Sequence, residues 1–166
     1  MTPLKRLPFS KYALFCLLFL LGNIANAGVY TSPSDSREYL TFTLTNQMKV
    51  LVISDPTSSK AAASLDVAVG SNANPKGREG LAHFLEHMLF LGTEKYPEAG
   101  DYQAFISSHG GNHNAYTAFE NTNYFFDIKA DSLEPALDRF SQFFISPLFT
   151  DKYVDRERHA VHSEYQ

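Results

Sequence analysis

The sequence has 166 residues, of which 44% are hydrophobic, 19% charged and 14% aromatic, and its formal net charge is -4 at pH 7. This composition is typical of a globular domain and excludes a disordered chain, a collagen-like fibre and a disulfide-stabilised miniprotein. The small excess of acidic residues argues against nucleic acid as a partner.

Residues 1–27 have the features of a secretory signal peptide. Lys5, Arg6 and Lys11 precede or flank the start of an apolar run over residues 13–21, and residues 25–27 (Ala-Asn-Ala) form a cleavage site before Gly28. Nine residues of helix extend about 14 Å, whereas a bilayer core measures about 30 Å, so cleavage is favoured over the alternative of an uncleaved anchor. We therefore expect an exported protein with no membrane attachment after cleavage, periplasmic in a bacterium or else secreted.

Cleavage would change the chemistry that is open to the mature chain. It removes three cations and no acid, so the net charge would fall from -4 to -7, and it removes Cys16, the single cysteine. A metal site in the remaining chain must then use His, Asp or Glu side chains.

The first half of the mature chain is dominated by predicted strands. Residues 28–37 form a polar leader, and residues 38–45 and 48–54 predict two strands joined by a tight turn. Residues 61–70 alternate as a third strand, and the Asn-, Pro- and Gly-rich residues 71–80 predict a loop.

The second half interleaves helices with strands. The pattern predicts helices over residues 81–91 and from Asp101 to about 109, then a hairpin of residues 114–119 and 123–129. Asp131 and Glu134 have capping-box spacing for a helix that runs to about 145, and a last helix follows Pro147 from about 151. We predict an α+β domain over residues 38–166, with a mixed or antiparallel sheet covered by helices.

The most informative segment is His83-Phe84-Leu85-Glu86-His87. On a helix, residues i and i+4 lie on one face, so both imidazoles can reach the same metal ion, and Glu86 lies on the same side. Two imidazoles and one carboxylate suit zinc, which lowers the pKa of a bound water, and a nearby carboxylate can accept the proton. The H-x-x-E-H order is a known zinc-peptidase motif, and the alternative is a solvated helix face.

A third ligand has two candidates on the predicted last helix, Glu157 and Glu164. They are seven residues apart and therefore share a face. One of them can bind the metal while the other orients a metal-binding histidine, or each can be an ordinary exposed acid.

The run from Gly80 to Thr93 resembles the signature of the insulinase/pitrilysin family of zinc metallopeptidases. The resemblance extends over roughly residues 38–166 and includes, in chain order, residues 53–56, 64–67, 114–117, 122–125, 136–140, 156–157 and 163–164. It implies that the domain is the N-terminal part of an insulinase-type metallopeptidase domain, apparently truncated. Family members are several times longer, with further similar domains that close a chamber around the peptide.

The resemblance also implies a role for each residue of the site. His83, His87 and Glu164 match the ligands of one zinc ion per chain, Glu86 matches the general base, and Glu157 matches a supporting acid.

Other matched positions belong to substrate binding in the family. Asn114, Ala115 and Tyr116 match a strand whose exposed edge accepts the substrate backbone, and Phe90 matches a hydrophobic residue of the cleft. For Phe90 and Tyr116, ordinary core packing is an equal alternative.

Three hypotheses for function follow. The first is a zinc metalloendopeptidase that cleaves peptides or small polypeptides with a metal-activated water. The second is a non-catalytic peptide-binding or scaffolding member of the same fold, and the third is an inactive truncated remnant. The expected partners are a peptide substrate and the remaining domains of a longer chain or a partner subunit. The 166 residues alone are expected to be a poor peptidase, because Glu164 lies near a fraying terminus.

Overall fold

The computed structural model describes residues 29–166, which form two compact units that divide after Thr57. The predicted signal peptide and Cys16 lie outside the described residues. Within residues 29–166, no helix combines the length and the apolar character needed to cross a bilayer.

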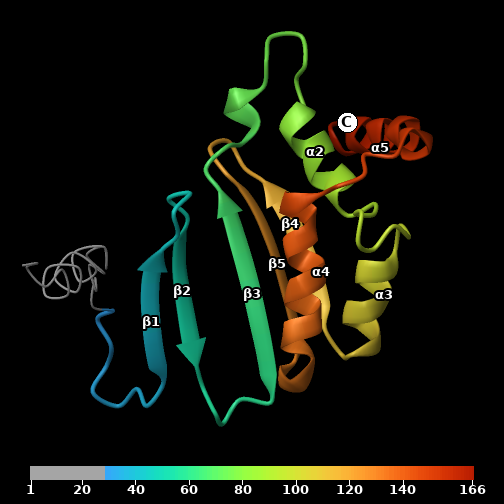
Figure 1. Ribbon diagram of the computed structural model, residues 1–166. Helices are drawn as coiled ribbons and strands as arrows, with labels where there is room; N and C mark the ends of the chain where they lie inside the picture. The colour runs from blue at the N-terminus through green and yellow to red at the C-terminus, as the bar shows by residue number, and fades with distance from the viewer. Residues whose placement is uncertain (1–28) are drawn as a thin grey trace, which may run out of the picture. The chain divides into compact units, whose positions relative to one another are not determined.

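The first unit contains a β-hairpin. Strand β1 (Glu38–Thr43) pairs antiparallel with β2 (Lys49–Ser54) (Figure 1). The turn between them is closed by a hydrogen bond from the Gln47 N–H to the Leu44 carbonyl oxygen at 2.9 Å. The Met48 N–H also donates to the side chain of Asn46 at 3.1 Å. The two predicted strands and their turn are confirmed.

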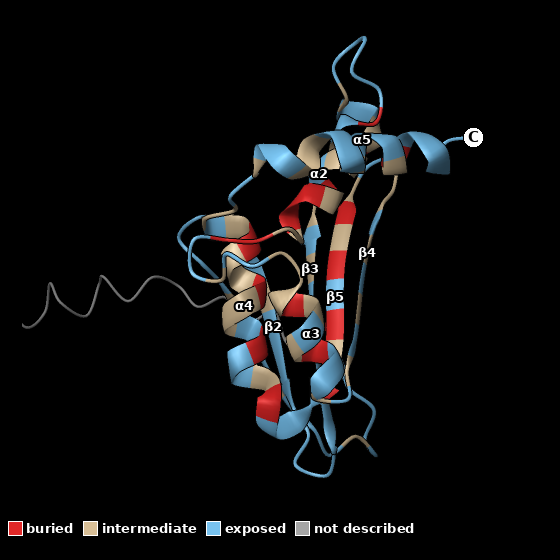
Figure 2. Ribbon diagram, turned by 90° about the vertical axis from the view of Figure 1, so that its right-hand side faces the viewer, coloured by how far each residue is buried: buried red, intermediate tan, exposed pale blue. Residues whose placement is uncertain are grey.

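The second unit is built on a three-stranded antiparallel sheet. Its order is β3 (Lys60–Val67), β5 (Thr122–Lys129) and β4 (Asn112–Thr117), so β5 is central and β4 is an edge strand (Figure 1). Along β5 every second residue is buried, as Figure 2 shows. One face of this sheet is therefore covered, and the other is open.

Helices cover the buried face. They are α2 (Leu81–Leu89), α3 (Asp101–Ser108) and α4 (Leu133–Ile145), while α5 (Asp151–Glu164) lies beside α2 (Figure 1). The buried core between sheet and helices consists of Leu89, Tyr102, Ile106, Tyr124, Phe126, Ile128, Ala136, Phe140 and Phe143. The predicted α+β class is confirmed.

The third strand ends earlier than the sequence predicts. The third strand ends at Val67 rather than at residue 70, because the chain turns there and Gly70 passes against the Ala118 backbone. A Cβ at Gly70 would lie 2.3 Å from the Ala118 oxygen.

The predicted capping box is also wrong. A 3-10 turn, η2 (Ala130–Ser132), precedes α4, and the N-cap residue Ser132 makes no side-chain capping bond. Instead, the Ser132 hydroxyl donates to the Asp131 carboxylate at 3.1 Å, which keeps that carboxylate from the helix N-terminus.

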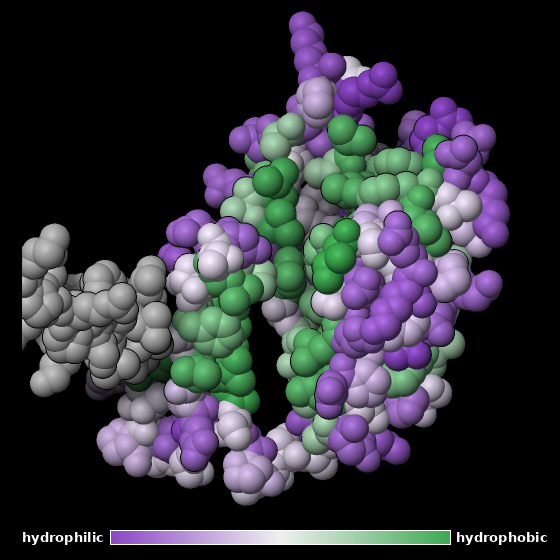
Figure 3. Space-filling view, viewed as in Figure 1, coloured by the Kyte–Doolittle hydropathy of each residue, from purple (hydrophilic) through white to green (hydrophobic). Residues whose placement is uncertain are grey.

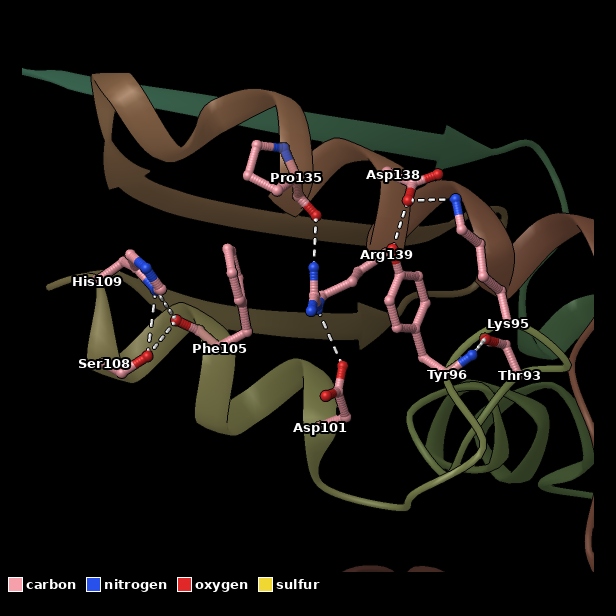
Figure 4. A network of polar contacts seen from close by, with 10 residues as sticks. All are labelled: Thr93, Lys95, Tyr96, Asp101, Phe105, Ser108, His109, Pro135, Asp138 and Arg139. Carbon is pink, nitrogen blue, oxygen red and sulfur yellow. Dashed lines mark hydrogen bonds and ion pairs between the residues drawn. The ribbon is translucent and has the colours of Figure 1, made fainter.

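A polar network fixes α3 and the preceding loop against α4 (Figure 4). The Arg139 guanidinium lies 4.3 Å from the Tyr96 ring centroid and 4.0 Å from that of Phe105, and its Nε donates to Asp101 at 2.9 Å. Asp138 accepts hydrogen bonds from Lys95 and Tyr96, which lower the pKa of its carboxyl group. These contacts hold the segment that follows α2.

An apolar hollow of about 420 Å³ opens beside α2, where hydrophobic side chains gather in Figure 3. Leu81, Leu85 and Leu89 line it from one face of α2. No Asp, Glu or His side chain lines this hollow, so the polar chemistry of α2 belongs to its opposite face.

Candidate metal centre

The start of α2 is set by a glycine and a distant side chain. Gly80 is the N-cap residue with φ 89°, a left-handed conformation that glycine adopts without strain. The Asn74 side chain accepts a hydrogen bond from the Ala82 N–H at 2.9 Å, which satisfies one of the free donors of the first turn. This start places His83 and His87 one turn apart on the same face.

The structure brings His83, His87 and Glu164 together. Their ligand atoms all lie within 4.8 Å of one another. The two Nε2 atoms are 3.1 Å apart, and Glu164 Oε2 lies 3.2 Å from His83 Nε2 and 3.7 Å from His87 Nε2.

These separations fit a single metal ion. Two donors that bind zinc tetrahedrally at about 2.0–2.1 Å lie about 3.3 Å apart, close to the separations in this cluster. Two imidazoles and a carboxylate are also a donor set that zinc accepts. The Glu164 side chain is 54% exposed, so the cluster is open to solvent on that side. The three side chains could hold a metal ion.

Glu157 lies behind His87. Its Oε2 is 3.1 Å from His87 Nδ1, and its other oxygen accepts a hydrogen bond from Arg156 Nε at 2.7 Å. A proton on Nδ1 that is donated to this carboxylate leaves the Nε2 lone pair free for a metal. Glu164 therefore lies in the cluster and Glu157 lies behind a histidine, while the roles of the two acids stay predictions.

Glu86 is buried, with 6% of its surface exposed. The Thr117 hydroxyl donates to its Oε2 at 2.5 Å. Burial, together with the charge of Glu86, raises the pKa of Tyr124. No sequence pattern points to Thr117, and only the contact between α2 and β4 reveals this hydrogen bond.

Asn114, Ala115 and Tyr116 lie on the edge strand β4. The Ala118 N–H donates to the Asn121 oxygen across the end of the β4–β5 pair, so by alternation the main-chain groups of residues 113, 115 and 117 point away from β5. The Ala115 N–H is bonded to the Asn114 side chain at 2.9 Å, and Tyr116 is 50% exposed. No other strand among residues 29–166 pairs with this edge.

Phe90 directly follows α2 and packs with core aromatics. Its ring centroid lies 5.0 Å from that of Phe143 and 5.9 Å from that of Tyr102. This placement favours core packing, the alternative to a role in the cleft.

Two further histidines lie away from the metal cluster. His109 donates from Nδ1 to the Phe105 carbonyl oxygen at 2.7 Å, and His113 packs against the Tyr102 ring, so neither joins the metal cluster.

The chain is similar to eukaryotic peptidases over most of its length. It is 54% identical over 135 residues to human insulin-degrading enzyme, covering 81% of this chain and 13% of that enzyme. It is 56% identical over 133 residues to the Arabidopsis thaliana protein "Insulin-degrading enzyme-like 1, peroxisomal", covering 80% and 14%. It is 52% identical over 130 residues to the A-factor-processing enzyme of Saccharomyces cerevisiae, covering 78% and 13%. The chain thus spans about one seventh of these relatives.

These relatives contradict the expected export to a bacterial periplasm. They come from human, plant and yeast, and one of them is named peroxisomal. The prediction of location is therefore wrong. It depended on residues 1–27 alone, whereas the similarity to the family model begins at residue 49, so the leader has no support from the shared domain.

Two solved structures share the fold. The crystal structure of pitrilysin matches with a TM-score of 0.80 and 40% identity, covering 84% of this chain and 15% of that one. A protease from Helicobacter pylori matches with a TM-score of 0.70 and 27% identity, covering 76% and 30%. The model of the insulinase family (peptidase family M16) matches residues 49–166, and the chain belongs to this family.

Proposed function

We propose that this chain carries the zinc site and the catalytic base of a metalloendopeptidase that hydrolyses peptide bonds. The observation that carries the proposal is that His83, His87 and Glu164 meet within 4.8 Å, although they lie on two helices and Glu164 is 77 positions after His87. Solvated helix faces do not require three such groups to converge on one point.

His83, His87 and Glu164 would hold the ion. Zinc, when bound, polarises the peptide carbonyl and lowers the pKa of a water molecule. Glu157 would accept a hydrogen bond from the Nδ1–H of His87, which fixes the ring and directs Nε2 to the cluster.

Glu86 is the proposed base. It lies on α2 between the two histidines, is nearly excluded from solvent, and is not itself part of the three-residue cluster. Its carboxylate accepts a proton from the attacking water and returns it to the leaving amine. One of its oxygens is engaged by Thr117, and the other is available for this transfer.

The edge of β4 is the proposed binding surface for the peptide. Asn114, Ala115 and Tyr116 lie on the strand whose end touches Glu86 through Thr117. A peptide that pairs with this edge gains main-chain hydrogen bonds with little sequence preference. A non-catalytic binding role has less support, because the ligand set and the base are all present.

The proposal is tested by zinc stoichiometry together with peptide hydrolysis. The purified chain is expected to contain about one zinc ion, and the double variant His83→Ala, His87→Ala is expected to contain none and to cleave no peptide. Chelator treatment of the wild type should match the variant, and added zinc should restore activity only to the wild type. Full zinc content in a folded double variant would overturn the metal site.

A further inference from the structure

Thr117 connects the free edge of the sheet to the buried carboxylate of Glu86. It is the last residue of β4, and its hydroxyl reaches Glu86 on α2 across 31 positions of sequence. Among residues 29–166, Thr117 is the one residue whose side chain donates a hydrogen bond to the Glu86 carboxylate. Since Glu86 is only 6% exposed, removal of the hydroxyl would leave a buried acceptor without this hydrogen bond.

The main chain of Thr117 faces a different direction from its side chain. The Ala118 N–H donates to the Asn121 oxygen, so the neighbouring Thr117 has its N–H and C=O directed away from β5, towards the free edge. The same residue therefore offers its backbone to an incoming strand and its hydroxyl to Glu86.

We propose that Thr117 is a positioning residue for peptide hydrolysis, which aligns Glu86 with a peptide bound on β4. The inference rests on the proposed function of Glu86. Bound through Oε2, the carboxylate keeps one rotamer and leaves Oε1 free for the proton. Without the hydroxyl, a buried carboxylate has lost its partner and rotates, and displacements of about 1 Å at a reacting group lower the rate strongly.

A purely structural role makes a different prediction. If Thr117 only holds α2 against β4, its loss lowers stability but leaves the turnover of the folded, zinc-loaded protein intact. Thr122 is a matched control, because it lies directly opposite Thr117 and its hydroxyl donates to the Val69 carbonyl oxygen at 2.9 Å. It is buried but does not contact Glu86.

The experiment compares the zinc-loaded chain with its variants Thr117→Val, Thr117→Ser and Thr122→Val. Valine keeps the shape of threonine without the hydroxyl, whereas serine keeps the hydroxyl. For Thr117→Val we expect full zinc content, a KM for a fluorogenic peptide within about twofold of wild type, and a kcat at least tenfold lower. Thr117→Ser should recover most of the kcat, and Thr122→Val should keep it while losing thermal stability.

A spectroscopic readout accompanies turnover. The visible absorption spectrum of the cobalt(II)-loaded chain depends on groups near the metal, so it should change in Thr117→Val and not in Thr117→Ser or Thr122→Val. An unchanged kcat in Thr117→Val, or a loss no larger than that of Thr122→Val, overturns the inference. Where turnover is below detection, identical cobalt spectra overturn it. If Glu86→Gln retains hydrolysis, the proposed function fails instead, which separates the two outcomes.

Discussion

Glu157 and His87 lie on different helices, 70 positions apart in sequence, and Glu157 Oε2 is 3.1 Å from His87 Nδ1. The Glu157 side chain is only 12% exposed, and Arg156 binds its second oxygen. A carboxylate held on both sides in this way has one orientation, so it fixes the plane of the imidazole ring. Helix α5 therefore contributes to the site twice, through Glu157 and through Glu164.

The first prediction concerns this carboxylate. Glu157→Gln keeps an oxygen that can accept the Nδ1 proton but removes the charge, so we expect the zinc affinity to fall by about 10- to 100-fold. Zinc competition with a chromophoric chelator measures the change. Asp155→Asn is a matched control, since Asp155 lies on the same helix and its side chain is 83% exposed. Equal zinc affinities of Glu157→Gln and Asp155→Asn would show that Glu157 does not support the metal site.

The second prediction separates the base from the ligands. In Glu86→Gln the amide oxygen can still accept the Thr117 hydrogen bond, so the fold and the zinc content should be retained. Peptide hydrolysis should fall by at least about 100-fold, because the amide cannot take a proton from water. Glu94→Gln removes an exposed acid just beyond α2 and should leave the rate unchanged. A zinc-loaded Glu86→Gln with most of its activity would place the base elsewhere.

Local periodicity is sufficient to predict the part of the site that lies on α2. His83, Glu86 and His87 are within about one helical turn of each other, so their i, i+3 and i+4 spacing alone places them on the same side of the helix. Periodicity does not choose between Glu157 and Glu164 as the third ligand. The family resemblance makes that choice, and in the structure Glu164 lies near both histidines while Glu157 lies behind His87.

The long-range contacts could not be predicted from the sequence. The hydrogen bond from Thr117 depends on the register of β4 against β5 and on how α2 crosses β4. Whether Phe90 packs in the core depends on its tertiary neighbours, and in the structure its ring contacts that of Phe143 on α4. Asp131 has the spacing of a cap, but a 3-10 turn removes it from the helix start. Each of these is decided by tertiary packing rather than by local pattern.

The third prediction concerns pH. Burial lowers the pKa of His113, whose ring packs against those of Tyr102 and Phe90. Below its unfolded pKa of about 6.5, the unfolded chain binds a proton that the folded chain resists, so stability is lost as the pH falls from about 6.5 towards the folded pKa. Above about 6.5 this group adds no pH dependence.

The measurement uses urea unfolding of the chelator-treated protein from pH 7.5 to pH 5. We expect His113→Phe to lose less stability than wild type over this range, because the aromatic packing remains and the titrating group is gone. The other histidines are common to both proteins, so the difference between the curves isolates His113. Parallel curves would show that its burial does not influence folding.

The last prediction tests the edge of β4 as the peptide-binding surface. The alternation of the β4–β5 ladder directs the Ala115 N–H towards the free edge, where the Asn114 side chain accepts it at 2.9 Å. Proline has no N–H, yet it is tolerated on an edge strand where the N–H faces outward. Ala115→Pro should therefore fold, keep its zinc, and bind peptide more weakly by about 2- to 12-fold, the effect of losing a main-chain hydrogen bond of about 0.5–1.5 kcal/mol.

Tyr116→Pro is the matched control on the adjacent residue. The Tyr116 N–H faces β5, so proline at this position removes a ladder hydrogen bond and should lower the stability of the fold. Peptide affinity is measured by fluorescence anisotropy in the zinc-loaded Glu86→Gln background, where the labelled peptide is not consumed. If Ala115→Pro binds as tightly as its parent, the peptide does not pair with this edge. If Ala115→Pro unfolds while Tyr116→Pro is stable, the assigned alternation is reversed, and residues 114 and 116 rather than 113, 115 and 117 would face the incoming strand.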